Sequence, residues 1–114
     1  MLIREIKDIL EAKVLCGEDL LDTEVKSACG SDLMSDVLAF VKEQSVLLTG
    51  LMNPQVVRTA DMMDMRCIVF VRGKEPEQSV VELARQRDIV MMTTAQRMFV
   101  ACGKLYSAGL VGNS

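Results

Sequence analysis

Apolar and polar residues follow one another along the chain in blocks that differ in period. Residues 2–12 predict a helix, because apolar residues recur at helical spacing on one face and charged residues cover the other. A short apolar run at 14–16 leads into a turn-rich stretch, and residues 25–29 predict a strand that glycine and serine then break. The first part of the chain therefore combines one helix with two short extended segments.

The next helix is expected to begin at Asp32, with either Ser31 or Asp32 as its cap. Its apolar residues are predicted to form one buried stripe, which consists of Leu33, Val37 and Val41 with Met34 and Leu38 beside them.

From there on, apolar runs and helical segments alternate regularly. The expected order is run 45–51, helix 54–65, run 67–71, helix 76–87, run 89–93 and helix 95–108. Pro54 and Pro76 stand where a first helical turn needs no backbone N–H partner, and Gly109 is the expected stop of the last helix. The pattern is β-α-β-α-β-α.

The three runs are continuously apolar and do not alternate, which is typical of strands buried on both faces. We therefore expect an α/β fold with a mostly parallel sheet of about four to five strands flanked by helices. The 114 residues match the usual size of one domain, and half of them are hydrophobic, so residues 1–114 are expected to form a single domain.

Charge and hydropathy exclude several partners. The chain has 16 acidic and 13 basic residues, a mixed balance that leaves no footprint for nucleic acid or an anionic membrane. Charged residues interrupt every apolar stretch before it reaches the length of a spanning helix, and the first ten residues do not resemble a secretory signal. A cytoplasmic location is expected.

The chain contains no histidine, which removes the commonest general base and metal ligand and excludes Ser-His and Cys-His nucleophiles. Its four cysteines are irregularly spaced in apolar segments and are expected to be reduced, buried thiols. We therefore expect no enzyme activity, no metal and no cofactor.

In open parallel sheets, ligands bind beyond the carboxyl ends of the strands, where loops meet helix N-termini. Small and polar residues gather at these junctions and suit an anionic ligand. The candidate ligand-binding residues are Gly30, Ser31, Asp32, Asp36, Thr49, Asn53, Arg72, Gly73, Lys74, Thr93 and Thr94. The loop from Arg72 to Lys74 is the junction with two cations and the best candidate for phosphate contact. The alternative is that these are ordinary capped loops with solvated charges.

Two acidic groups allow other interpretations. Asp32 and Asp36 are four residues apart on one helix face, where they could share a magnesium ion or a proton, although capping explains Asp32 more simply. The segment 60–67, ADMMDMRC, contains soft sulfur ligands for copper(I), but its spacing fits the end of an amphipathic helix, and core packing is the preferred interpretation.

The segment LDTEVKSACGSDLMSDVLAF, residues 21–40, resembles the segment that gives the DRTGG domain family its name. The positions that match are Asp22, Gly30, Ser31, Asp32, Leu33, Ser35, Asp36 and Val37. The similarity continues through residues 47–76 and into the closing FVACGKLYSAGL. The departures from the literal family letters lie at Thr23, Glu24, Ser27 and Ala28, and one of the paired glycines is lost.

The resemblance implies a compact α/β domain similar to the N-terminal domains of HPr kinase and the muramyl ligases. In larger family members this module accompanies CBS domains in regulated pyrophosphatases and also occurs in phosphate acetyltransferases and cobyrinic acid synthase-like proteins. It resembles a regulatory or dimerising accessory there, with the chemistry carried out by other domains. This chain is accordingly expected to be a stand-alone DRTGG domain protein.

Three functions remain open at this point. The first is a homodimeric, non-catalytic sensor that binds an adenine nucleotide or another anionic metabolite and acts on a partner protein. The second is a purely structural interaction subunit without a ligand. The third, a small phosphotransferase, is disfavoured because histidine, a P-loop and a paired nucleophile and base are all missing.

Overall fold

The computed structural model describes residues 1–40 and 44–112, which form one sheet with helices packed on both faces. In chain order the elements are α1 (Ile3–Leu10), β1 (Lys13–Cys16), the 3-10 helix η1 (Glu18–Leu20), β2 (Ser27–Gly30), α2 (Met34–Phe40), β3 (Ser45–Thr49), α3 (Pro54–Met62), β4 (Cys67–Phe70), α4 (Gln78–Gln86), β5 (Val90–Thr93), α5 (Met98–Ser107) and β6 (Val111–Gly112).

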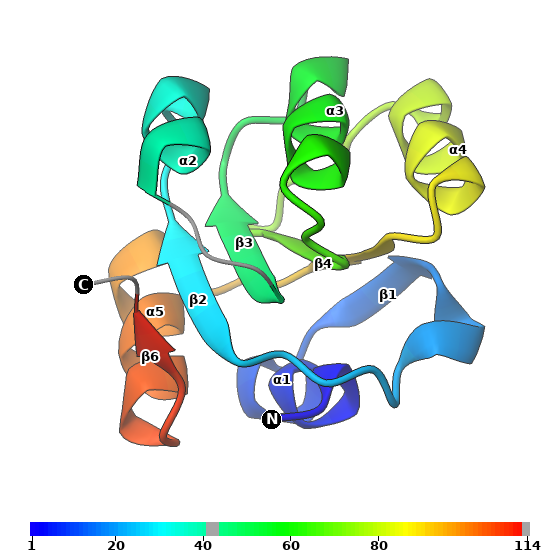
Figure 1. The fold of residues 1–114 in the computed structure, drawn as a ribbon. Coiled ribbons are helices and arrows are strands. Elements are labelled where there is room, and N and C mark those ends of the chain that lie inside the picture. The colour runs from blue at the N-terminus through cyan, green and yellow to red at the C-terminus, as the bar shows by residue number, and fades with distance from the viewer. Residues whose placement is uncertain (41–43, 113–114) are drawn as a thin grey trace.

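The strands lie in the order β1-β5-β4-β3-β2-β6 (Figure 1). All neighbouring pairs are parallel except β1 with β5, which is antiparallel. The expected α/β fold with a mostly parallel sheet is confirmed. The sheet has six strands, because the two-residue strand β6 returns beside β2 after α5.

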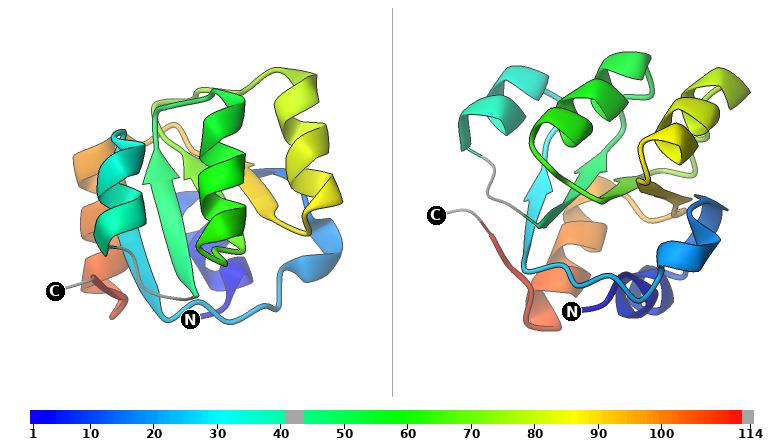
Figure 2. Two further views of the ribbon diagram at one scale, coloured as in Figure 1. Left: turned by 45° about the horizontal axis from the view of Figure 1, so that its top comes forward. Right: turned by 45° about the vertical axis from the view of Figure 1, so that its right-hand side comes forward.

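Helices α2, α3 and α4 cover one face of the sheet, and α1 and α5 cover the other (Figure 2). The sheet therefore separates two hydrophobic clusters, one beneath each helical layer. Every residue of β3, β4 and β5 is buried, as the continuous apolar runs predicted for strands covered on both faces.

Helix α2 begins at Met34, two residues later than expected, and this changes its buried face. Met34 and Val37 are buried, whereas Leu33 is 58% exposed and Leu38 is 40% exposed. The expected stripe through Leu33 is wrong because residues 31–33 are held in the loop that follows β2. The remaining stripe residue, Val41, lies outside the described residues.

Two of the later helices also start late, for a shared reason. Helix α4 begins at Gln78 and not at Pro76, and α5 begins at Met98 and not at Ala95. The residues in front of them belong to two loops that bond to each other: the carbonyls of Thr94 and Gln96 accept hydrogen bonds from the β4–α4 loop. Pro54, in contrast, opens α3 as predicted.

The ends of two elements need correction as well. Helix α3 stops at Met62 and not at Met65, because Asp64 adopts a left-handed conformation (φ 57°) and the buried Met65 donates its N–H back to Ala60. Gly30 does not break its strand but pairs with Leu48 as the last residue of β2.

Helix α5 ends as predicted. Gly109 adopts φ 105°, and the Gly109 and Leu110 N–H groups donate to the carbonyls of Tyr106 and Leu105. This pattern is a Schellman motif, in which glycine relieves the strain of the left-handed turn.

All four cysteines are free thiols. Cys16 and Cys67 are buried as expected, whereas Cys29 and Cys102 are half-buried. Burial raises the pKa of each thiol, so the cysteines behave as small apolar groups and not as ready nucleophiles.

Candidate ligand-binding site

The loops that follow the parallel strands meet at one edge of the sheet. In the strand register, Gly30 pairs with Leu48, Thr49 with Phe70, and Phe70 with Thr93. The carboxyl ends of β2, β3, β4 and β5 are therefore level with one another, and the loops beyond them lie together along the top of the left view in Figure 2. This is the edge at which α/β sheets bind ligands.

Asp32 connects the loop after β2 to the end of β3. Its Oδ1 accepts a hydrogen bond from the Thr49 hydroxyl at 2.9 Å and another from the Gly50 N–H at 2.7 Å. The Thr49 oxygen in turn accepts the N–H of Leu51 at 3.1 Å. The Asp32 carboxylate thus binds the end of the neighbouring strand β3 and does not cap α2. In the loop before α2, the Ser31 hydroxyl accepts a hydrogen bond from the Leu33 N–H at 3.0 Å.

These contacts keep Asp32 ionised. The Gly50 N–H bond is the largest cause that lowers the pKa of its carboxyl, and the Thr49 hydroxyl and the charges of Arg72 and Lys74 act in the same direction, against desolvation. The Asp32 residue is nevertheless exposed. An anchored, charged carboxylate therefore lies at the surface of this edge.

Arg72 approaches the same place from the end of β4. A Cβ atom added to Gly50 would lie 2.5 Å from Arg72 Nη2, so the guanidinium rests directly over the Gly50 backbone. Only glycine leaves room for this approach. Asp32, Thr49, Gly50 and Arg72 consequently converge, with a cation beside a carboxylate.

The backbone at Arg72 and Gly73 has positive φ values of 62° and 68°. With the Lys74 N–H directed at the Val71 carbonyl at 3.4 Å, these two residues form a type I′ turn. The Arg72 and Gly73 N–H groups donate to the carbonyls of Gln96 and Thr94, both at 2.7 Å. These amides are therefore not free for a ligand, and the turn offers its side chains.

The hydroxyls of both threonines at the end of β5 donate hydrogen bonds to backbone carbonyls. Thr93 donates to the Lys74 carbonyl at 2.6 Å, and Thr94 donates to the Leu10 carbonyl at 2.7 Å. Both residues are buried. They fix the loops that carry Arg72 and Lys74, and Thr94 also connects this edge to α1.

The remaining candidates are more scattered. A Cβ on Gly30 would lie 2.7 Å from Cys102 Sγ, so this glycine admits α5 close to β2. Asp36 is exposed on α2, and Asn53 stands exposed before α3 at the rim of a recess. The structure brings Asp32, Thr49 and Arg72 together, whereas Gly30, Asp36 and Asn53 lie apart from this contact set.

Two residues of the edge were not among the individual candidates. Gly50 lies in the strand-end junction from Thr49 to Asn53, which the sequence indicated, and it had a readable signal because it directly follows a buried strand. Gln96 had none, because it contributes only its carbonyl, and a backbone acceptor is present in every residue.

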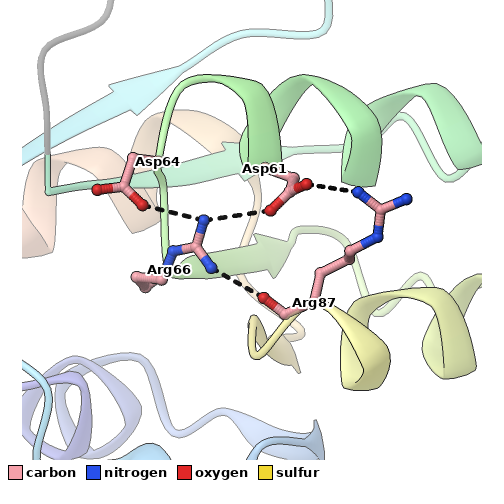
Figure 3. A network of polar contacts seen from close by, with 4 residues as sticks. All are labelled: Asp61, Asp64, Arg66 and Arg87. Carbon is pink, nitrogen blue, oxygen red and sulfur yellow. Dashed lines mark hydrogen bonds and ion pairs between the residues drawn. The ribbon is translucent and has the colours of Figure 1, made fainter.

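The acidic segment 60–67 lies at the opposite edge of the sheet, before β4. Asp61 Oδ2 pairs with Arg87 at 2.5 Å, and Asp61 Oδ1 and Asp64 pair with Arg66 at 3.3 and 3.1 Å (Figure 3). Arg66 also donates to the Arg87 carbonyl at 2.8 Å. Core packing holds for Met65, which is buried, but not for Met62, which is 72% exposed.

Within the described ranges, 1–40 and 44–112, no group of three histidine, cysteine, aspartate or glutamate residues is placed to hold a metal ion. No helix among the same residues has the length and apolar character needed to cross a bilayer.

The fold and its polar edge define a class: an α/β domain with a mostly parallel sheet and a charged loop cluster at the carboxyl ends of its strands. The model of the DRTGG domain family matches residues 5–107, so the chain belongs to the DRTGG domain family. The resemblance seen in the sequence is confirmed. No curated protein matches this chain.

A solved structure shares the fold. It is the regulatory region of a Clostridium perfringens pyrophosphatase, composed of CBS and DRTGG domains and complexed with its activator, diadenosine tetraphosphate. The TM-score is 0.70 at 17% sequence identity, over 88% of this chain and 44% of that chain. The present chain thus spans less than half the length of that regulatory region.

Proposed function

We propose that residues 1–114 act as one regulatory, non-catalytic domain that binds an anionic, nucleotide-like metabolite at the carboxyl edge of the sheet. The ligand-bound form of the domain would then regulate a partner protein. The observation that carries this proposal is the Arg72 guanidinium held over Gly50 beside the anchored carboxylate of Asp32. A cation beside an anchored acceptor suits a ligand with both phosphate and hydroxyl groups.

The roles follow from the charges. The planar guanidinium of Arg72, with Lys74 on the same turn, would bind phosphate oxygens. Asp32 would accept a hydrogen bond from a ribose hydroxyl through the oxygen that does not bind Thr49 and Gly50. That the related regulatory region was solved with a nucleotide activator supports the same ligand class.

The residues at this edge favour binding over catalysis. The hydroxyls of Thr49, Thr93 and Thr94 all donate to protein acceptors, and the lowered pKa of Asp32 makes its carboxylate a weak base. The chain has no histidine to activate a nucleophile.

Isothermal titration calorimetry with ADP, ATP and diadenosine tetraphosphate tests the proposal. We expect at least one of them to bind the native chain and Arg72→Ala to weaken it about tenfold or more, since hydrogen bonds to charged groups contribute about 1.5–3 kcal/mol. Arg58→Ala, which removes an exposed arginine on α3, is the matched control and should leave binding unchanged. Binding that is equally strong in both variants, or no binding at all, would contradict the proposal.

The exposed face of α5 supports the homodimer that the sequence led us to expect. Phe99 is 88% exposed, Tyr106 is 73% exposed and Val100 is 44% exposed, with Gly103 between them. If two copies cross antiparallel near Gly103, Phe99 of each copy meets Tyr106 of the other. Four aromatic side chains at about 150 Å² each supply about 600 Å², a large part of the roughly 1,200–2,000 Å² of a stable interface.

Sedimentation equilibrium at tens of micromolar measures this association. The native chain should be a dimer, and the double variant Phe99→Ser/Tyr106→Ser should be a monomer with unchanged secondary structure. Leu33→Ser, which removes an exposed apolar residue in the loop before α2, should remain a dimer. A dimer that binds no phosphorylated ligand would favour the second candidate function, a structural interaction subunit.

A further inference from the structure

A recess of about 340 Å³ lies between the loops that lead into α3 and α4. Met52 and Pro54 line it from the β3–α3 side, and Pro76 and Val80 line it from the β4–α4 side. Asn53 and Glu77 add polar groups among these apolar side chains. Glu75 and Ser79 complete the lining, so the recess combines four apolar with four polar residues. Its volume lies within the range of small-molecule sites.

We infer that this recess binds a nucleobase with an exocyclic amino group, and that the phosphates of the same ligand lie at Arg72; the inference rests on the proposed function and specifies its ligand. The two proline rings and the Met52 side chain offer apolar contact to a flat ring from two loops. A base of this kind presents N–H donors at its edge, and Glu77 and Asn53 can accept them.

The acceptors are available. Among the described residues, no hydrogen bond or ion pair involves the side chain of Glu77 or Asn53, although both stand directly before a helix. Glu75, which also lines the recess, lies 3.5 Å from Lys13 in an exposed ion pair. Glu77 and Asn53 are therefore the groups that a base would meet.

Charge fixes the orientation of the ligand. Carboxylates in the recess repel phosphate, whereas the cations Arg72 and Lys74 precede them on the same loop. Lys74 and Glu77 are three residues apart, which limits their Cα separation to about 11 Å. One loop thus presents cations at one end and acceptors at the other, matching the phosphate and amino-base ends of a nucleotide.

Calorimetry with AMP, IMP and ribose 5-phosphate tests the recess. IMP lacks the exocyclic amine and ribose 5-phosphate lacks the base. AMP should bind about tenfold more tightly than IMP, the factor expected for one hydrogen bond to a carboxylate, and Glu77→Ala, which removes the acceptor, should remove most of this preference. Ser79→Trp, which fills the recess from an exposed position, should reduce AMP binding to the level of ribose 5-phosphate.

Gln86→Trp, at the exposed far end of the same helix, is the matched control and should bind AMP normally. If AMP, IMP and ribose 5-phosphate bind alike and Ser79→Trp binds all three like the native chain, the recess is not a base site while the proposed function stands. If no phosphorylated ligand binds, the proposed function fails, and the binding of adenosine then tests whether the recess is a base site. Adenosine binding that Ser79→Trp abolishes supports it, and no adenosine binding overturns it.

Discussion

At the scale of single residues, the candidate site depends on the backbone conformation of Arg72. Arg72 occupies the left-handed region at φ 62°, which is uncommon for a residue with a side chain. The turn that holds it is fixed by two hydrogen bonds, which the Arg72 and Gly73 N–H groups donate to carbonyls of the β5–α5 loop. This turn places the Arg72 guanidinium over the Gly50 backbone.

Gly50→Ala should weaken ligand binding while leaving the stability of the fold nearly unchanged. The new methyl group meets only the far end of the flexible Arg72 side chain, so the free energy of unfolding should change by no more than about 0.5 kcal/mol. Ligand affinity should fall about tenfold because the guanidinium is displaced. Denaturant unfolding and calorimetry measure the two effects.

A double-mutant cycle provides the control. In an Arg72→Ala background, Gly50→Ala should have no further effect on affinity, because the displaced group is gone. An equal loss of affinity in both backgrounds would show that Gly50 acts independently of Arg72.

At the scale of elements, Asp61 connects the end of α3 to the end of α4 through ion pairs. It accepts from Arg87 after α4 and from Arg66 before β4, and Arg66 is itself bonded to the Arg87 carbonyl (Figure 3). The Arg87 hydrogen bond is the largest cause that lowers the pKa of the Asp61 carboxyl, and Arg66 adds to it. This network is structural and lies far from the loop edge.

The pH dependence of stability tests this network. A lowered folded pKa means that the stabilisation is fully present above the unfolded value of about 3.9 and is lost as the pH falls through the folded pKa. Asp61→Asn should lower the free energy of unfolding by about 1 kcal/mol at pH 7. The difference from the native chain should shrink between about pH 5 and pH 2.

Urea unfolding across this pH range gives the comparison. Asp88→Asn removes a nearby exposed carboxylate that has no ion pair among the described residues, and it should show no such convergence. A constant difference between Asp61→Asn and the native chain down to pH 2 would rule out the ion pairs as its cause.

The register of α2 makes a second prediction at this scale. Met34→Ala should lower the free energy of unfolding by about 2 kcal/mol or more, because Met34 is buried between α2 and the sheet. Leu33→Ala should cost no more than about 0.5 kcal/mol, because Leu33 is 58% exposed. Thermal or urea unfolding of both variants compares the two losses of stability. A larger loss for Leu33→Ala would mean that Leu33 belongs to the buried stripe expected from the sequence.

At the scale of the whole molecule, the sheet should be most stable at its centre. β3, β4 and β5 are buried throughout, whereas β6 has only two residues, both exposed, and β1 is interrupted by a register shift. Hydrogen exchange should therefore be slowest in the three central strands and fastest in β6. Fast exchange in β4, which has a strand on each side, would contradict this order.

The sequence predicted a large part of the fold and less of the site. Three continuous apolar runs identified the central strands, because burial on both faces leaves a local signal. It also placed Asp32, Thr49 and Arg72 at strand ends. It could not show that Asp32 bonds to Thr49 and Gly50, since the partners are 17 and 18 residues away and either loop could have been capped locally.

The sequence by itself determined the alternation of strands and helices, the burial of the central strands and the lack of histidine chemistry, because periodicity and composition are local properties. Tertiary structure alone decided that β1 pairs antiparallel with β5, that β6 returns beside β2, and that Arg72 lies over Gly50. These features depend on pairing between distant segments, whose free energy comes from contacts that no local pattern encodes.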